Sequence, residues 1–266
     1  MSAAFLCSTR PSERSRDTLI GLCAAIIIII MITPRSFDRL LHTWSRDPIN
    51  RLGFWSALLA AVSATVCSVA ALLELLDAIP RLLGIRLVDA SSLILAVTIV
   101  VMMSSIHHTV SGDQRVWSFT GVTFAVLYAS QVSLMYIVQL FVYLPKAQRG
   151  TLSEIERMLL ADTFGIFLQA VDGLRYLFLG LATLAVAPVF AGGGLRRWIR
   201  RFFVANGIVT IPVFLTYFVD PGFLPLAGLW VVAVPVSTFL VAVHFRRQRY
   251  TLEERGNPHS ETESPT

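Results

Sequence analysis

The pattern of apolar and polar positions is clearest over residues 116–144. This stretch holds no charged side chain, and it is long enough to cross the hydrocarbon core of a bilayer as an α-helix, which takes about 20 residues. Only helices and closed barrels satisfy their backbone hydrogen bonds inside lipid. The chain does not show the alternating pattern of barrel strands. The stretch therefore predicts the central helix of an all-α, polytopic membrane helix bundle.

One side of this central helix is polar. At about 100° per residue its polar side chains fall on one arc, and an amide or phenol buried without a partner costs roughly 2–7 kcal/mol, so the arc should face protein or a wet cavity. The arc is either a path for a small molecule or ion or a set of interhelical hydrogen bonds. The polar arc consists of Thr120, Tyr128, Gln131, Tyr136, Gln139 and Tyr143, and the opposite side of Val122, Val126, Leu134, Ile137, Leu140 and Phe141.

Further apolar segments flank the central helix and give seven hydrophobic helices in total. The segment at 18–33 would be only about 24 Å long at 1.5 Å per residue, so a six-span alternative stays open. Ser153 and Glu156 have the spacing of a capping box and predict that a helix begins near Leu152. We expect a turn over 80–89 and an end of the last helix at the arginines of 246–249. The other spans are expected at 53–76, 90–106, 202–219 and 223–245.

Composition agrees with a membrane protein. Hydrophobic residues make up 55% of the 266 residues and charged residues 15%, against about 25% charged in soluble proteins. One transmembrane domain over 18–245 accounts for this, with a polar segment at 1–17 and a disordered tail at 246–266. The three cysteines, Cys7, Cys23 and Cys67, lack zinc-type spacing and fit small core positions.

The basic residues predict an orientation. Arginine groups at 196–201 and 246–249 flank a hairpin whose turn at 220–222 carries no positive charge. Because positive loop charges favour the cytoplasmic side, the C-terminus is expected in the cytoplasm, with the chain in the inner or plasma membrane. The net charge of +5 does not indicate nucleic-acid binding, because the arginines are spread between apolar segments. The expected partners are the lipid bilayer, with cytoplasmic arginines in contact with anionic lipid, and a small-molecule or ion ligand.

A second polar face lies on the fifth helix. Its residues recur at spacings of three, four and seven, and Asp172 and Arg175 are three apart and can pair. Charges inside a membrane usually face the bundle interior or water. The face is either a proton or cation relay through Asp162 and Asp172 or a charged entry turn followed by a glycine packing seam. It consists of Asp162, Gly165, Gln169, Asp172, Gly173, Tyr176 and Gly180.

The histidines His107 and His108 follow the third span, close to Asp113. Ser104 and His108 share a helix face, and this Ser-x-x-x-His element resembles that of the seven-helix membrane metal hydrolases related to alkaline ceramidases. The resemblance implies a zinc site that would use His107, His108 and Asp113. That family has a His-x-x-x-His pair in its last helix, where this chain has His244 alone. An interfacial helix cap and loop is the alternative for the same residues.

The sequence therefore favours a non-enzymatic membrane protein that transports or senses a small molecule or ion. Its polar interior would lie between the central and fifth helices. The alternatives are an intramembrane metal hydrolase and an interaction subunit without a ligand. No cofactor is expected, since the chain has no glycine-rich phosphate loop, HExxH or GxSxG motif. A retinal Schiff base is excluded because Lys146, the single lysine, falls in a loop of this topology. The pattern does not define an oligomeric state.

Overall fold

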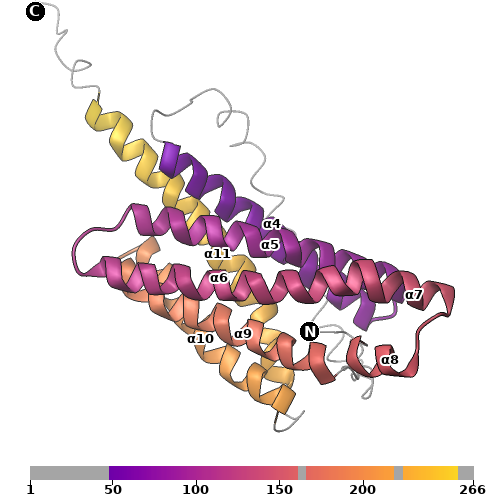
Figure 1. Cartoon of the computed structure of the whole chain (residues 1–266). Helices are drawn as coiled ribbons and strands as arrows, with labels where there is room; N and C mark the ends of the chain where they lie inside the picture. Colours follow the sequence, from indigo (N-terminus) through magenta and orange to yellow (C-terminus); the bar gives the residue numbers. More distant parts are fainter. Residues whose placement is uncertain (1–47, 161–165, 219–223, 257–266) are drawn as a thin grey trace, which may run out of the picture.

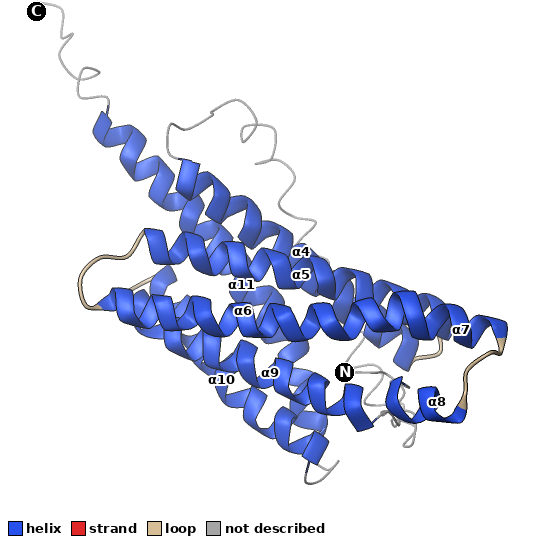
Figure 2. Ribbon diagram, viewed as in Figure 1, coloured by secondary structure: helices blue, strands red, loops and turns tan. Residues whose placement is uncertain are grey.

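The computed structural model of the chain describes residues 48–160, 166–218 and 224–256. Over these ranges the chain is almost entirely helical and contains no strand (Figure 2). Within these described ranges, six helical segments are long and apolar enough to cross a membrane. The all-α membrane bundle predicted from the sequence is confirmed, and the chain has the architecture of a multi-pass membrane protein. The expected first helix at 18–33 lies outside the described residues.

The helices follow one another along the chain with short connections (Figure 1). The central helix lies in the span Gln114–Arg149, one long helical segment that is α-helical at both ends and π-helical in between. The elements are α4 (Pro48–Leu75), α5 (Arg81–His108), α6 (Gln114–Val138), η2 (Gln139–Tyr143), α7 (Leu144–Arg149), α8 (Glu154–Leu160), α9 (Ile166–Val186), η3 (Ala187–Phe190), α10 (Leu195–Phe218) and α11 (Leu224–Gly256).

The six long helices form a closed ring. Each packs against the next along the chain, in the order α4, α5, α6, α9, α10 and α11, and α11 returns to pack against α4. Short connections make successive helices antiparallel, so the ring has two ends. One end holds the starts of α4, α6 and α10 and the C-terminal halves of α5, α9 and α11. We call this the arginine end, because α10 begins there with Arg196 and Arg197.

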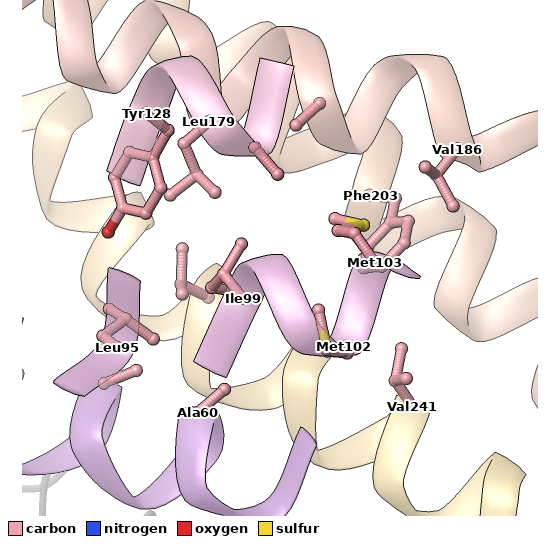
Figure 3. Close-up of a cluster of buried hydrophobic side chains, with 14 of the residues drawn as sticks. Ala60, Leu95, Ile99, Met102, Met103, Tyr128, Leu179, Val186, Phe203 and Val241 are labelled. Atoms are coloured by element: carbon pink, nitrogen blue, oxygen red, sulfur yellow. The ribbon is translucent and has the colours of Figure 1, made fainter. Parts of the chain in front are cut away.

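The middle of the ring is filled with apolar side chains from every helix (Figure 3). Met102 and Met103 of α5 are fully buried, and they lie near Phe203 of α10. Alanines on α4, such as Ala57 and Ala60, are also fully buried. This filled middle separates the two ends of the bundle. It also contains Leu95, Ile99, Tyr128, Leu179, Val186 and Val241.

Close approach of α9 to α10 depends on glycine. A Cβ atom added at Gly180 would lie 1.8 Å from Oγ1 of Thr210, and one at Gly207 would lie 2.1 Å from Cγ of Leu184. Without a hydrophobic driving force between helices in lipid, such small residues allow the backbone contact that holds membrane helices together. Gly180, one of the glycines on the predicted face of the fifth helix, therefore serves packing.

Several predicted boundaries need correction. Residues 81–89 were expected to form a turn, but they are the first turns of α5, whose backbone amides at Leu83 and Gly84 donate to the Pro80 carbonyl. Proline fits the start of a helix because its φ is already helical. The last helix does not end at the arginines of 246–249 but continues to Gly256, since arginine and glutamate are good helix formers. Residues 257–266 of the expected tail lie outside the described residues.

The capping box is confirmed. The Ser153 hydroxyl accepts a hydrogen bond from the Glu156 amide at 3.2 Å, and the Glu156 carboxylate accepts one from the Ser153 amide at 3.0 Å. The helix begins at Glu154, two residues after the expected position. Glu156 also pairs with Lys146 of α7, which connects the end of the span Gln114–Arg149 to α8.

Candidate functional site

A buried ion pair lies on the inner side of α9. Arg175 Nε donates to the Asp172 carboxylate one turn earlier, and the two residues are only 2% and 3% exposed. Asp172 is six residues after the start of the helix at Ile166, or about 9 Å along its axis at 1.5 Å per residue. Charged groups in membrane helices are costly to desolvate, so they pair with one another or face the interior. Both conditions are met here.

Aromatic rings surround the Arg175 guanidinium. Its Cζ lies 5.0 Å from the centroid of the Tyr136 ring on α6 and 4.5 Å from that of Tyr176 on α9. Its Nη2 also donates to the Tyr176 hydroxyl at 3.1 Å. A cation over an aromatic face gains about 2 kcal/mol or more once it is desolvated. The cluster thus links α6 to α9 through one charge.

Trp230 brings α11 into the same cluster. Its ring meets the Tyr176 ring edge-on, with centroids 5.2 Å apart. Trp230 is 6% exposed, and its Nε1 has no hydrogen-bond partner among the described residues. An indole N–H usually has an acceptor when it is buried. This donor is therefore available to a water molecule or a ligand beside the aromatic rings.

Polar groups of α4 and α5 are buried in the same part of the bundle. Cys67 Sγ on α4 lies 3.4 Å from the Ser92 hydroxyl on α5, and the Ser68 hydroxyl donates to the Val231 carbonyl on α11 at 3.1 Å. Five helices therefore contribute polar side chains to this half of the interior. We call the set Asp172, Arg175, Tyr136, Tyr176 and Trp230 the buried charge cluster.

The polar arc of the central helix is largely directed away from lipid. Tyr128, Tyr136 and Gln139 are buried, while Gln131, Tyr143 and Thr120 are half-buried. On the opposite side, exposure is highest at Phe141, and Val122 and Leu140 are half-buried. Gln139 is the first residue of the π-helical turn η2. Such turns occur often at functional sites because they re-aim side chains.

Two candidates of the fifth helix are not located. Asp162 lies outside the described residues, and the side chain of Gln169 lies outside them as well. Asp172, Arg175 and Tyr176 are therefore the members of the predicted face that the structure brings together with the central helix. Gly180, five residues past Arg175 and four past Tyr176, lies against Thr210 instead.

The histidine segment adopts a different arrangement from a metal site. His107 Nδ1 lies 2.9 Å from the Ser118 hydroxyl of α6, and His108 is exposed, with the two imidazole centroids 5.9 Å apart. Asp113 is exposed just before the start of α6. Within the described residues, no three His, Cys, Asp or Glu side chains come close enough to share a metal ion. His107 links the ends of two helices.

Some members of the interior were not expected from the sequence. Trp230 and Ser92 follow no polar stripe, and Asp89 was assigned to a turn, although it is a buried residue of α5. Lone polar residues in an apolar helix give no periodic signal. Their role depends on which helices become neighbours, and the order of packing in the ring decides that.

Outside the membrane spans, Glu156 has a shifted pKa. The Lys146 ammonium, followed by hydrogen bonds from Ser153, lowers the pKa of this carboxyl from 4.5 to about 2. The Glu156 carboxylate of the capping box therefore stays charged throughout the physiological range.

No protein-family model matches this chain, and neither does any curated protein or solved structure. The similarity to membrane metal hydrolases thus rests on Ser104 and His108 alone.

Proposed function

We propose that this protein transports or senses a small molecule or ion through the polar interior between α6 and α9. The observation that supports this best is the buried Asp172–Arg175 pair against Tyr136. A packed apolar interior would serve stability as well or better, because replacing a buried ion pair by hydrophobic residues is often neutral or stabilising. A charged pair kept in this position is typical of an ion or substrate pathway.

The chemistry of the cluster indicates how a solute would interact with it. An anion would compete with the Asp172 carboxylate for the Arg175 guanidinium, and a proton or cation would compete with Arg175 for the carboxylate. The unpaired Nε1 of Trp230 adds a donor beside these groups. Either exchange breaks a buried pair, which couples occupancy to the packing of α6 against α9.

The apolar middle of the ring implies that this conformation is closed. Met102, Met103 and Phe203 fill the space between the buried charge cluster and the arginine end. Passage would require movement of these side chains or of a helix. The π-helical turn at Gln139 is a suitable place for α6 to adjust its hydrogen bonding. A sensor would need only the competition of a solute for the Asp172–Arg175 pair. A transporter would need this competition and also the movement that opens the apolar middle.

The orientation is part of the proposal, with the chain in the inner or plasma membrane and its C-terminus in the cytoplasm. The basic residues of the arginine end support this through the positive-inside rule. They include Arg51, Arg115, Arg196, Arg197, Arg200, Arg201, Arg246 and Arg247, whereas the opposite end has Arg81, Arg86, Lys146, Arg149 and Arg157. An alkaline phosphatase or fluorescent protein fused after Thr266 reports the side, and phosphatase activity there would reverse the orientation.

Flux measurements on the purified protein in liposomes test the function. We expect proton, sodium or potassium flux, or chloride flux for an anion pathway, above that of empty liposomes. The Asp172→Asn change should reduce the flux at least ten-fold, the order of a 1.4 kcal/mol change in a barrier. The control is Thr123→Val, an exposed position on α6, which should leave the flux unchanged.

A second variant separates function from folding. The double change Asp172→Leu with Arg175→Met removes both charges without leaving one unpaired, so it should keep the fold. We expect it to unfold at or above the temperature of the parent and yet to lose the flux. Flux equal to that of the parent would contradict the proposal. So would a parent protein with no ion flux and no thermal shift from any ion or metabolite tested.

A further inference from the structure

A separate pocket lies at the arginine end, on the other side of the apolar middle from the buried charge cluster. It has a volume of about 210 Å³, and residues of α5, α6, η3, α10, α11 and the turn after α5 line it. This is about seven times the ~30 Å³ share of one water molecule in the liquid. The pocket is thus large enough for a small organic ion.

The floor of the pocket is apolar and its rim is polar. Ile106, Phe190 and Phe245 are buried at the floor. The His244 ring packs on Phe190 with centroids 5.4 Å apart, which holds the imidazole at the pocket wall. The rim is formed by Thr109, Ser111, Gln114, Arg196, His244 and Gln248. Such a pocket can hold a polar head group together with a short apolar portion.

Arg196 is held in place at the rim. Its Nη2 donates to the Val189 carbonyl at 2.8 Å, so the guanidinium is attached to the last turn before the connection to α10. A guanidinium has five N–H donors, so this bond leaves donors for a ligand. Arginine presents them in a planar fork that matches the oxygens of phosphate and carboxylate groups.

The charge of the lining selects for anions. Among the residues that the structure describes, no acidic side chain lines this pocket, while the same end of the bundle carries Arg197, Arg200 and Arg201 on exposed faces of α10. Carboxamides at Gln114 and Gln248 and the hydroxyl of Ser111 can donate to an anion but cannot neutralise a cation, whereas the Thr109 hydroxyl already donates to the Ile106 carbonyl at 2.8 Å. An inorganic cation would thus meet a positive field and no charged ligand.

We propose that this pocket binds the phosphate group of a phosphate ester, with Arg196 as the main ligand and His244 and Gln248 as additional donors. The phosphate could belong to an anionic lipid headgroup or to a free phosphate ester, since both present the same oxygens. The lipid source has support from Trp198, which is exposed two residues after Arg196. Tryptophan is enriched at the headgroup level of membranes. This inference concerns a different site from the buried charge cluster and does not depend on the proposed transport.

Binding experiments on the full chain in nanodiscs distinguish the two sources. In the first arm, glycerol 3-phosphate is titrated into protein in phosphatidylcholine nanodiscs, with glycerol as the uncharged control. In the second arm, phosphatidylglycerol replaces part of the phosphatidylcholine, and native mass spectrometry counts the lipid retained by the protein. Saturable binding in the first arm supports the free ester, and retention in the second supports the lipid headgroup.

Charge-matched variants test the pocket itself. Arg196→Gln should weaken binding roughly ten-fold or more, as expected for the loss of a charge-assisted hydrogen bond. The control is Arg200→Gln, which removes the same charge one turn later on α10, from an exposed residue outside the pocket. At the same salt concentration it should change the affinity by less than about two-fold. Gln248→Leu provides a second variant that leaves the Arg196–Val189 bond intact, and it should also weaken binding.

Equal effects of Arg196→Gln and Arg200→Gln would show a diffuse basic surface and overturn the proposal. The absence of saturable binding in both arms would overturn it too.

Discussion

The Arg175 guanidinium on α9 lies 5.0 Å from the centroid of the Tyr136 ring on α6. Both residues are buried, and they come from helices that are neighbours in the ring. The guanidinium therefore interacts with both the Asp172 carboxylate and the face of the Tyr136 ring. A contact between two helices in the membrane thus depends on one positively charged side chain.

Substitutions at Tyr136 test this contact. Tyr136→Phe keeps the ring and should retain most of the stability, whereas Tyr136→Leu loses the cation–π interaction and should lower the free energy of unfolding by about 2 kcal/mol or more. Reversible unfolding in mixed micelles measures the difference. The control is Ile137→Leu, at an exposed neighbouring position, which should have little effect. Equal losses for the Phe and Leu variants would show that the ring does not stabilise the charge.

The losses of stability caused by mutating Asp172 and Arg175 should not be additive. Asp172→Leu or Arg175→Met alone leaves one charge buried without its partner and should cost about 3–5 kcal/mol of stability. The double variant should be more stable than either single variant, because no charge remains to be desolvated. The same unfolding assay on all four proteins gives the coupling energy. Additive losses would indicate that the two side chains do not interact.

Gly180 is expected to be the most sensitive glycine of α9. A Cβ atom there would overlap Thr210, which is on the neighbouring helix, so Gly180→Ala should force α9 and α10 apart and cost about 1–3 kcal/mol. Adding Thr210→Gly should recover part of the loss. The control is Gly228→Ala, since a Cβ at Gly228 meets no atom within 4 Å. The unfolding temperature should be lowest for Gly180→Ala and higher for the double variant with Thr210→Gly. The Gly228→Ala variant should be nearest to the parent.

The junction of α7 and α8 should be sensitive to acid. Because Lys146 and Ser153 lower the pKa of the Glu156 carboxyl from 4.5 to about 2, its contribution is complete above pH 4.5 and is lost as the pH falls through about 2. A carboxyl NMR titration should show the Glu156 midpoint near the lower value. In Lys146→Gln the pKa should rise toward 4.5. A midpoint that does not move in this variant would mean that the ion pair does not form in solution.

The two sides of the central helix should differ in their access to lipid. Single cysteines at Ile137 and Phe141, which are exposed, should react with a lipid-soluble maleimide in membranes. Cysteines at Tyr136 and Gln139 should react slowly, because both positions are buried. The rates are compared after normalisation to full labelling in detergent. Equal rates on both sides would place the polar arc against lipid and contradict the arrangement of the ring.

The sequence by itself was sufficient for the class of fold and for much of the helix content. Apolar runs long enough to span a bilayer can form little else than helices in lipid, so the spans around 53–76 and 116–144 could be predicted directly. The capping box at Ser153 and Glu156 is a local interaction, and it formed as expected. The sequence predicted the helix boundaries less well. Residues 81–89 were expected in a turn but are helical, because charged residues at a helix end have the composition of a loop.

Only the tertiary structure decided which polar residues meet. The pairing of Asp172 with Arg175 follows from spacing on one helix, but their contact with Tyr136 and the approach of Trp230 depend on the order of helices in the ring. The pocket beside Arg196 is likewise assembled from segments more than a hundred residues apart in the chain. Periodicity identifies which face of a helix is polar, since the spacing of residues on one helix fixes that face. Which residue of a neighbouring helix contacts that face is decided by the packing between helices. The apolar pattern of one helix holds no information about this packing.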